Sequence, residues 1–96
     1  MAKEGLTKDR LEILYIIYTL LLKSLKRERS WCIKRNRLIP DHPEVMIMCQ
    51  KIIDEINKDD EPEIDIKLKK SCKTIAQKLF DFLKTNNSIN KDNTNV

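Results

Sequence analysis

The pattern of hydrophobic and polar residues changes abruptly at Lys23. From Leu11 to Leu22 the chain reads LEILYIIYTLLL, in which ten of twelve residues are apolar. The β-branched residues of this run would also suit a strand, but its length favours a helix, because strands usually have about 3–10 residues. A surface helix carries an apolar stripe a little over 100° wide, whereas this segment is apolar around nearly its whole circumference. It therefore needs packing partners on several sides.

Local signals place this first helix at residues 8–37. Thr7 is a suitable N-cap, and Leu6 and Leu11 have the spacing of a hydrophobic staple. Nothing breaks the helix before Pro40, although a break near Ser30 is an alternative.

A second helix is predicted at residues 42–57. Asp41 is the expected N-cap, with Glu44 completing a capping box and Pro43 in the first turn. One apolar stripe follows at helical spacing, and it consists of Val45, Met48, Cys49, Ile52 and Ile56.

A third helix is predicted at residues 62–84, after a second start signal at Asp60–Glu63. A short extended entry over 64–68 is the alternative. The residues with helical spacing are Ile64, Leu68, Cys72, Ile75, Leu79, Phe82 and Leu83. Residues 86–96 are polar and low in complexity, which is typical of a disordered tail.

The fold class expected from these elements is all-α. Residues 1–85 form a single helical domain of three antiparallel helices with a long first helix. Two stripes, one from each later helix, cover about half of the first helix, and a two-fold dimeric bundle would cover the rest. The expected dimer interface consists of Ile13, Ile16, Ile17, Leu20 and Leu21. The alternative is that Tyr15, Tyr18 and Ile16 are simply half-exposed.

Charge adds a second feature. The net charge is +4, but residues 1–38 carry +6, residues 39–66 carry −7 and residues 67–96 carry +5. The basic segment, residues 23–37, holds seven Lys/Arg against the single acid Glu28. Such a surface suits the phosphate backbone of a duplex, which gives affinity without base readout. The residues expected to contact nucleic acid are Lys23, Lys26, Arg27, Trp31, Lys34, Arg35 and Arg37.

Other interpretations of the basic segment stay open. The acidic middle of the chain could neutralise it internally, or it could meet an acidic protein. Trp31 could stack on a base or hold Arg27 by a cation–π contact, but it could equally anchor a core or an interface. A further lysine cluster is predicted on the third helix, at Lys67, Lys69, Lys70, Lys73 and Lys78.

No pattern of catalytic chemistry is visible, so we expect neither enzymatic activity nor a cofactor, metal or small-molecule substrate. The single histidine, His42, lies at a helix start, where capping or exposure explains it. Cys32 lies among cations, which lower a thiol pKa, but a small buried residue is the simpler interpretation; Cys49 and Cys72 fall on core stripes. The apolar run is shorter than the roughly 20 residues that span a bilayer, and the unpatterned cysteines suggest an intracellular, cytoplasmic or nuclear protein.

No motif places the chain in a family. The plan of long basic helices on a dimeric bundle is similar to that of small viral suppressors of RNA silencing that bind double-stranded RNA, and no residue carries over from them. The resemblance implies binding to duplex RNA or DNA with little sequence specificity. The alternative is an adaptor subunit that docks its first helix into a partner protein.

Overall fold

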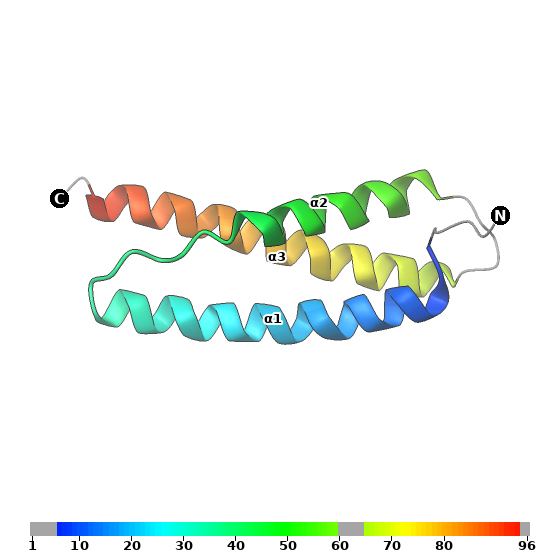
Figure 1. The fold of residues 1–96 in the computed structure, drawn as a ribbon, viewed down its shortest axis with the longest axis horizontal. Coiled ribbons are helices and arrows are strands. Elements are labelled where there is room, and N and C mark those ends of the chain that lie inside the picture. The colour runs from blue at the N-terminus through cyan, green and yellow to red at the C-terminus, as the bar shows by residue number, and fades with distance from the viewer. Residues whose placement is uncertain (1–5, 60–64, 95–96) are drawn as a thin grey trace.

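A bundle of three helices forms the molecule. The computed structural model describes residues 6–59 and 65–94, which contain α1 (Lys8–Lys34), α2 (Pro43–Lys58), α3 (Ile66–Thr94) and no strand. Consecutive helices run in opposite directions, so α1 and α3 point the same way (Figure 1). The prediction of an all-α fold with three helices is confirmed.

The core lies along α3, which packs against both other helices. On α1 the residues Leu11, Tyr18, Leu25 and Cys32 are buried, and their spacing of seven returns each to nearly the same side of the helix. The α3 residues Cys72, Ala76, Leu79 and Leu83 face them and are fully buried. On α2 the core residues are Cys49, Ile52, Ile53 and Ile56, whereas Met48, expected on the stripe, is exposed.

Helix α1 is continuous through Ser30, so the alternative break there is wrong. Thr7 caps its start as predicted, because Thr7 Oγ1 accepts a hydrogen bond of 3.1 Å from the Arg10 amide. The helix ends at Lys34 rather than Arg37. Asn36 adopts a left-handed conformation with φ 53°, and the Arg37 and Asn36 amides donate to the carbonyls of Cys32 and Ile33 at 2.9 and 3.2 Å. This pair of bonds is a Schellman motif, which turns the chain out of the helix.

The start of α2 differs from the prediction. Its N-cap is His42, not Asp41, and the His42 side chain makes no capping bond. His42 is left-handed (φ 31°, ψ 62°) and precedes Pro43, which occupies the first turn, where a missing N–H costs nothing. The His42 side chain is used elsewhere, in the contact with α1 described below.

Helix α3 both starts and ends later than predicted. The second start signal, Asp60–Glu63, lies outside the described residues, and Asp65 Oδ1 instead accepts a bond of 2.9 Å from the Lys67 amide. The expected disordered tail from residue 86 is helical as far as Thr94. Asn86 is only 1% exposed, and Asn90 binds the preceding loop, so polar contacts rather than an apolar stripe hold this part of α3.

Helix α2 lies beside only one part of α3 (Figure 1). Beside the other part, the third position in the bundle is taken by the loop 35–42 (Figure 1). Ile39 of that segment is 2% exposed. The α1–α2 connection is thus part of the core at the end of the molecule that carries the basic segment.

Candidate nucleic-acid interface

The basic segment occupies the last three turns of α1 and the start of the loop that follows. Six of its cationic side chains are exposed, namely Lys23, Lys26, Arg27, Lys34, Arg35 and Arg37. Within the described part of the chain none of the six forms an ion pair. Their charges are therefore not compensated by an ion pair within the described residues.

Three acidic side chains that could have neutralised these cations have other partners. Glu55 accepts from Arg10 at 2.6 Å, and Asp59 pairs with Lys69 at 2.6 Å. Glu28, the only acid of the basic segment, has its Oε1 2.8 Å from His42 Nε2. Within the described residues, no ion pair joins the six exposed cations to the acidic middle of the chain.

Trp31 contacts two of the six exposed cationic side chains. Trp31 is 45% exposed, and the guanidinium carbons of Arg35 and Arg37 lie 4.3 and 5.4 Å from the centroid of its ring. Arg27, which the sequence suggested as the cation–π partner, does not take this position. An exposed indole flanked by guanidinium groups offers both a stacking surface and phosphate donors.

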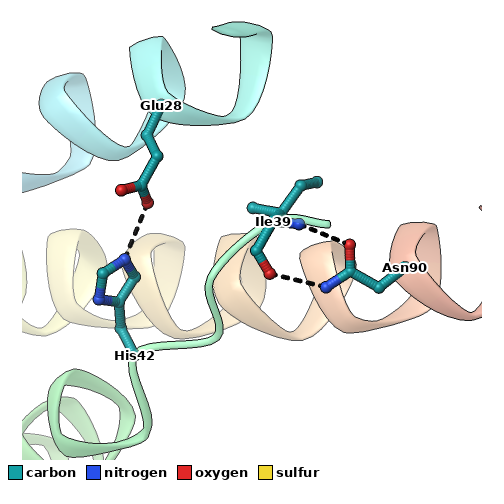
Figure 2. A network of polar contacts seen from close by, with 4 residues as sticks. All are labelled: Glu28, Ile39, His42 and Asn90. Carbon is teal, nitrogen blue, oxygen red and sulfur yellow. Dashed lines mark hydrogen bonds and ion pairs between the residues drawn. The ribbon is translucent and has the colours of Figure 1, made fainter. Parts of the chain in front are cut away.

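Two polar contacts hold the loop that carries Arg35 and Arg37 (Figure 2). The Asn90 side chain accepts from the Ile39 amide at 2.8 Å and donates to the Ile39 carbonyl at 2.7 Å. A few residues later, His42 contacts Glu28 on α1. The loop is thus attached to both α3 and α1, which fixes the backbone beside the arginines.

Arg29 belongs to the fold rather than to the interface. Its guanidinium carbon lies 4.1 Å from the centroid of the Phe82 ring, and it donates to Asn86 Oδ1 at 3.3 Å. Arg29 therefore joins α1 to α3, and it is not one of the six exposed cations.

A second basic feature lies between α1 and α3. An open groove of about 400 Å³, here called the lysine groove, is lined by Tyr15, Lys67, Lys70, Ser71, Thr74, Ile75 and Lys78. Lys73 lies in an adjoining hollow, whereas Lys69 faces α2 through its ion pair with Asp59. The sequence indicated the lysines, but the hydroxyl groups of Tyr15, Ser71 and Thr74 gave no signal of their own.

An exposed apolar surface lies on α1 opposite its core side. The outer stripe, defined as Ile13, Ile16, Ile17 and Leu20, has side chains 46–59% exposed. Leu21, which was predicted with them, is half-buried and packs against the core. The alternative that Tyr15, Tyr18 and Ile16 are half-exposed agrees with the single chain for Tyr15 and Ile16, which are 42% and 56% exposed, but is wrong for Tyr18, which is 1% exposed.

Burial has shifted the ionisation of three core groups. It raises the pKa of Tyr18 from 10.0 to about 12, and the nearby Cys49 and Cys72 thiols act in the same direction. It also raises the pKa of Cys49 from 9.0 to about 11, and that of Cys72 above 9.0. The three cysteines are buried and unbridged, and burial keeps Cys49 and Cys72 as neutral thiols.

Comparisons of the chain with protein-family models, with curated proteins and with solved structures gave no match. Over the described residues no helix is long and apolar enough to cross a bilayer. The same residues bring no three His, Cys, Asp or Glu side chains together in the way that a metal site requires.

Proposed function

We propose that the protein binds duplex nucleic acid through the phosphate backbone, with little sequence specificity. The observation that carries the proposal is the set of six exposed cations of the basic segment without an internal counter-charge. Arginine can grip phosphate with two donors and lysine acts as a point charge, so these side chains suit a backbone and carry no base code. The protein acts as a binding protein inside the cell, in cytoplasm or nucleus, and duplex RNA or DNA is the ligand.

We also propose that the protein is a homodimer that buries the outer stripe. Leaving four large apolar side chains about half in water forgoes part of the roughly 1.5–3 kcal/mol that full burial of each supplies. Two-fold dimers are the commonest oligomers, and a second copy supplies the same apolar surface. Sedimentation of the free protein at micromolar concentration should show twice the monomer mass of 11.4 kDa.

The test of nucleic-acid binding is a mobility shift with duplex RNA, duplex DNA and single strands at several salt concentrations. If about six phosphates of B-DNA are neutralised, the logarithm of affinity should fall against that of salt with a slope near −5, at about −0.9 per phosphate. The double variant Lys26→Glu with Lys34→Glu should abolish the shift, because it replaces two free cations with acids on the same surface.

The matched control is Lys51→Glu with Lys58→Glu, which makes the same charge change at two exposed positions of α2. It should bind nearly as the parent does. Normal duplex binding by the Lys26/Lys34 variant, or an equal loss in both variants, would contradict the assignment of this surface.

The second candidate function is that of an adaptor whose α1 docks into a different protein. The outer stripe favours it, since an exposed apolar row at helical spacing also suits a groove in a partner. The folding and oligomeric state of the isolated chain distinguish the two candidate functions. A well-folded homodimer favours duplex binding, whereas an aggregating or molten chain favours the adaptor.

A further inference from the structure

The outer face of α1 has a charge order that bears on how two copies would meet. Asp9 precedes the outer stripe, and Lys23, Ser24 and Arg27 follow it; all of these side chains are exposed. Steps of three and four residues connect Asp9 to Arg27 through Ile13, Ile17, Leu20 and Ser24, so these residues share one side of the helix. The face therefore reads acidic, apolar, basic.

This order is self-complementary in only one orientation. If two α1 helices pack in parallel, Asp9 meets Asp9 and Arg27 meets Arg27, and like charges across an interface are costly. If they pack antiparallel about a point between Ile16 and Ile17, facing residues have numbers that sum to 33. Ile13 then faces Leu20 of the second copy, and Asp9 faces Ser24, with Lys23 and Arg27 on either side of it. In the dimer these two cations therefore have a counter-charge, and the other four exposed cations of the basic segment remain for phosphate.

We propose that two copies pack α1 against α1 in antiparallel orientation, about a two-fold axis between Ile16 and Ile17, and so place the lysine groove and Lys26 of both copies on one side of the dimer. The proposal rests on the proposed homodimer and specifies its arrangement. An isologous interface of this kind closes with two subunits.

The shared side follows from the symmetry. A two-fold axis that relates antiparallel neighbours is perpendicular to both helices. Each α1 has two flanks, which are the sides next to the interface, and this axis makes a given flank point the same way in each copy. Parallel helices would place the same flanks on opposite sides.

Contacts on α1 identify which flank is free. Arg10 and Glu28 are five helical turns apart, and they bind Glu55 of α2 and His42 at its N-cap, so they mark the flank that faces α2. Tyr15, on the other flank, lines the lysine groove. Lys26 is eleven residues after Tyr15, about three turns, and lies on that flank. The lysine groove and Lys26 of both copies would therefore share one surface.

The spacing of the two basic regions suits a duplex. Lys26 lies between nine and ten residues from the proposed axis. The Lys26 residues of the two copies are therefore about 30 Å apart along the helix direction, at ~1.5 Å per residue. One turn of B-DNA is about 34 Å. The two copies could thus contact phosphates about one turn apart on the same side of the duplex.

Cysteine cross-linking tests the orientation without nucleic acid. Ile13→Cys and Leu20→Cys replace exposed side chains, so the fold should persist, and circular dichroism checks this. One variant is tagged to differ in size, the two are mixed, and a mild oxidant is added before a non-reducing gel. Because a disulfide needs Cα atoms within about 7 Å, the antiparallel dimer should give the mixed 13–20 product as its main band.

In this arrangement neither variant should cross-link well to its own kind. The Leu20 positions of the two copies are about 10 Å apart along the helix direction, and the distance between the two helices adds to this. The parent protein, with only its buried native thiols, is the control and should give no product. Strong 13–13 and 20–20 products would overturn the antiparallel arrangement but leave the proposed dimer in place. A dimer without any of these products would overturn this interface.

The experiments distinguish a failure of the proposed dimer arrangement from a failure of proposed nucleic-acid binding. A monomer in sedimentation would overturn both the dimer and its arrangement. A 13–20 cross-linked dimer that shifts no duplex would overturn nucleic-acid binding and leave the arrangement standing.

Discussion

Tyr18 is the residue whose chemistry depends most on its place in the core. It is 1% exposed, and burial raises its pKa to about 12. Cys49 in the same cluster has its pKa raised to about 11. Both groups are neutral when protonated, so the folded chain disfavours their ionised forms.

We therefore expect stability to fall at alkaline pH. A group whose folded pKa is raised stays protonated in the folded state while the unfolded chain already releases its proton, so the free energy of unfolding is unaffected below the ordinary pKa and decreases above it. The loss should begin near pH 9 with Cys49 and continue through pH 10 to 12 with Tyr18, at about 1.4 kcal/mol per pH unit for each group. Urea unfolding at a series of pH values measures it.

The variant Tyr15→Phe isolates the tyrosine part of this prediction, because the chain has only two tyrosines. Its tyrosinate absorbance should appear only near pH 12 while the protein is folded, and near pH 10 in denaturant. Absorbance that develops at pH 10 in the folded protein would contradict the burial of Tyr18.

At the scale of elements, the end of α3 and the loop 35–42 stabilise each other. Residues 86–94 lack a continuous apolar stripe, and the contacts that hold them are polar and come from far along the chain. Asn86 accepts from Arg29, and Asn90 binds both backbone groups of Ile39. Because a buried backbone group without a partner costs about 1–3 kcal/mol, these two bonds matter more than an exposed pair would.

Asn90→Ala should accordingly lower the free energy of unfolding by about 2–3 kcal/mol and speed amide exchange at Ile39. It should also weaken duplex binding, since the loop carries Arg35 and Arg37. Hydrogen exchange followed by NMR measures the exchange of the Ile39 amide. The matched control is Asn57→Ala, at an exposed position of α2. Unchanged protection of the Ile39 amide would show that Asn90 does not hold the loop.

At the scale of the whole molecule, α1 presents two apolar sides. One is covered by the other helices, and the opposite side, the outer stripe, is exposed in the single chain. The elongated shape, 54 × 22 × 20 Å, leaves this side accessible along the rod. Dimerisation and duplex binding are therefore expected to be coupled, because two linked basic surfaces bind with a higher effective concentration.

Ile17→Glu tests this coupling. A buried charge in the middle of the stripe should convert the dimer to a monomer, and duplex affinity should fall at least tenfold through the loss of bivalent contact. The free energy of unfolding of the single chain should change little, because Ile17 is not one of the core residues. Sedimentation and the mobility shift measure the two effects together.

Ile47→Glu makes the same change at a 65% exposed isoleucine on α2 and should leave both properties intact. A monomeric Ile17→Glu variant with unchanged duplex affinity would separate binding from dimerisation.

The sequence by itself determined the three helices, the start of α1 at Thr7, and the core positions of Cys49, Cys72 and Leu79. These follow from local capping chemistry and from apolar periodicity, which are short-range properties of the chain. It also determined that α1 has more apolar surface than two stripes can cover.

Only the tertiary structure decided where the helices end and which residues are exposed on each side of them. The helical end of α3 and the burial of Asn86 depend on contacts with residues more than fifty positions away, such as the bond from Arg29. Arg29 of the basic segment packs against α3, and Leu21, predicted for the dimer interface, packs against the core. The reason is the same for both: the side of a helix that is buried depends on where its neighbours pack. Local periodicity describes each helix alone, and it carries no information about which partner each side will meet.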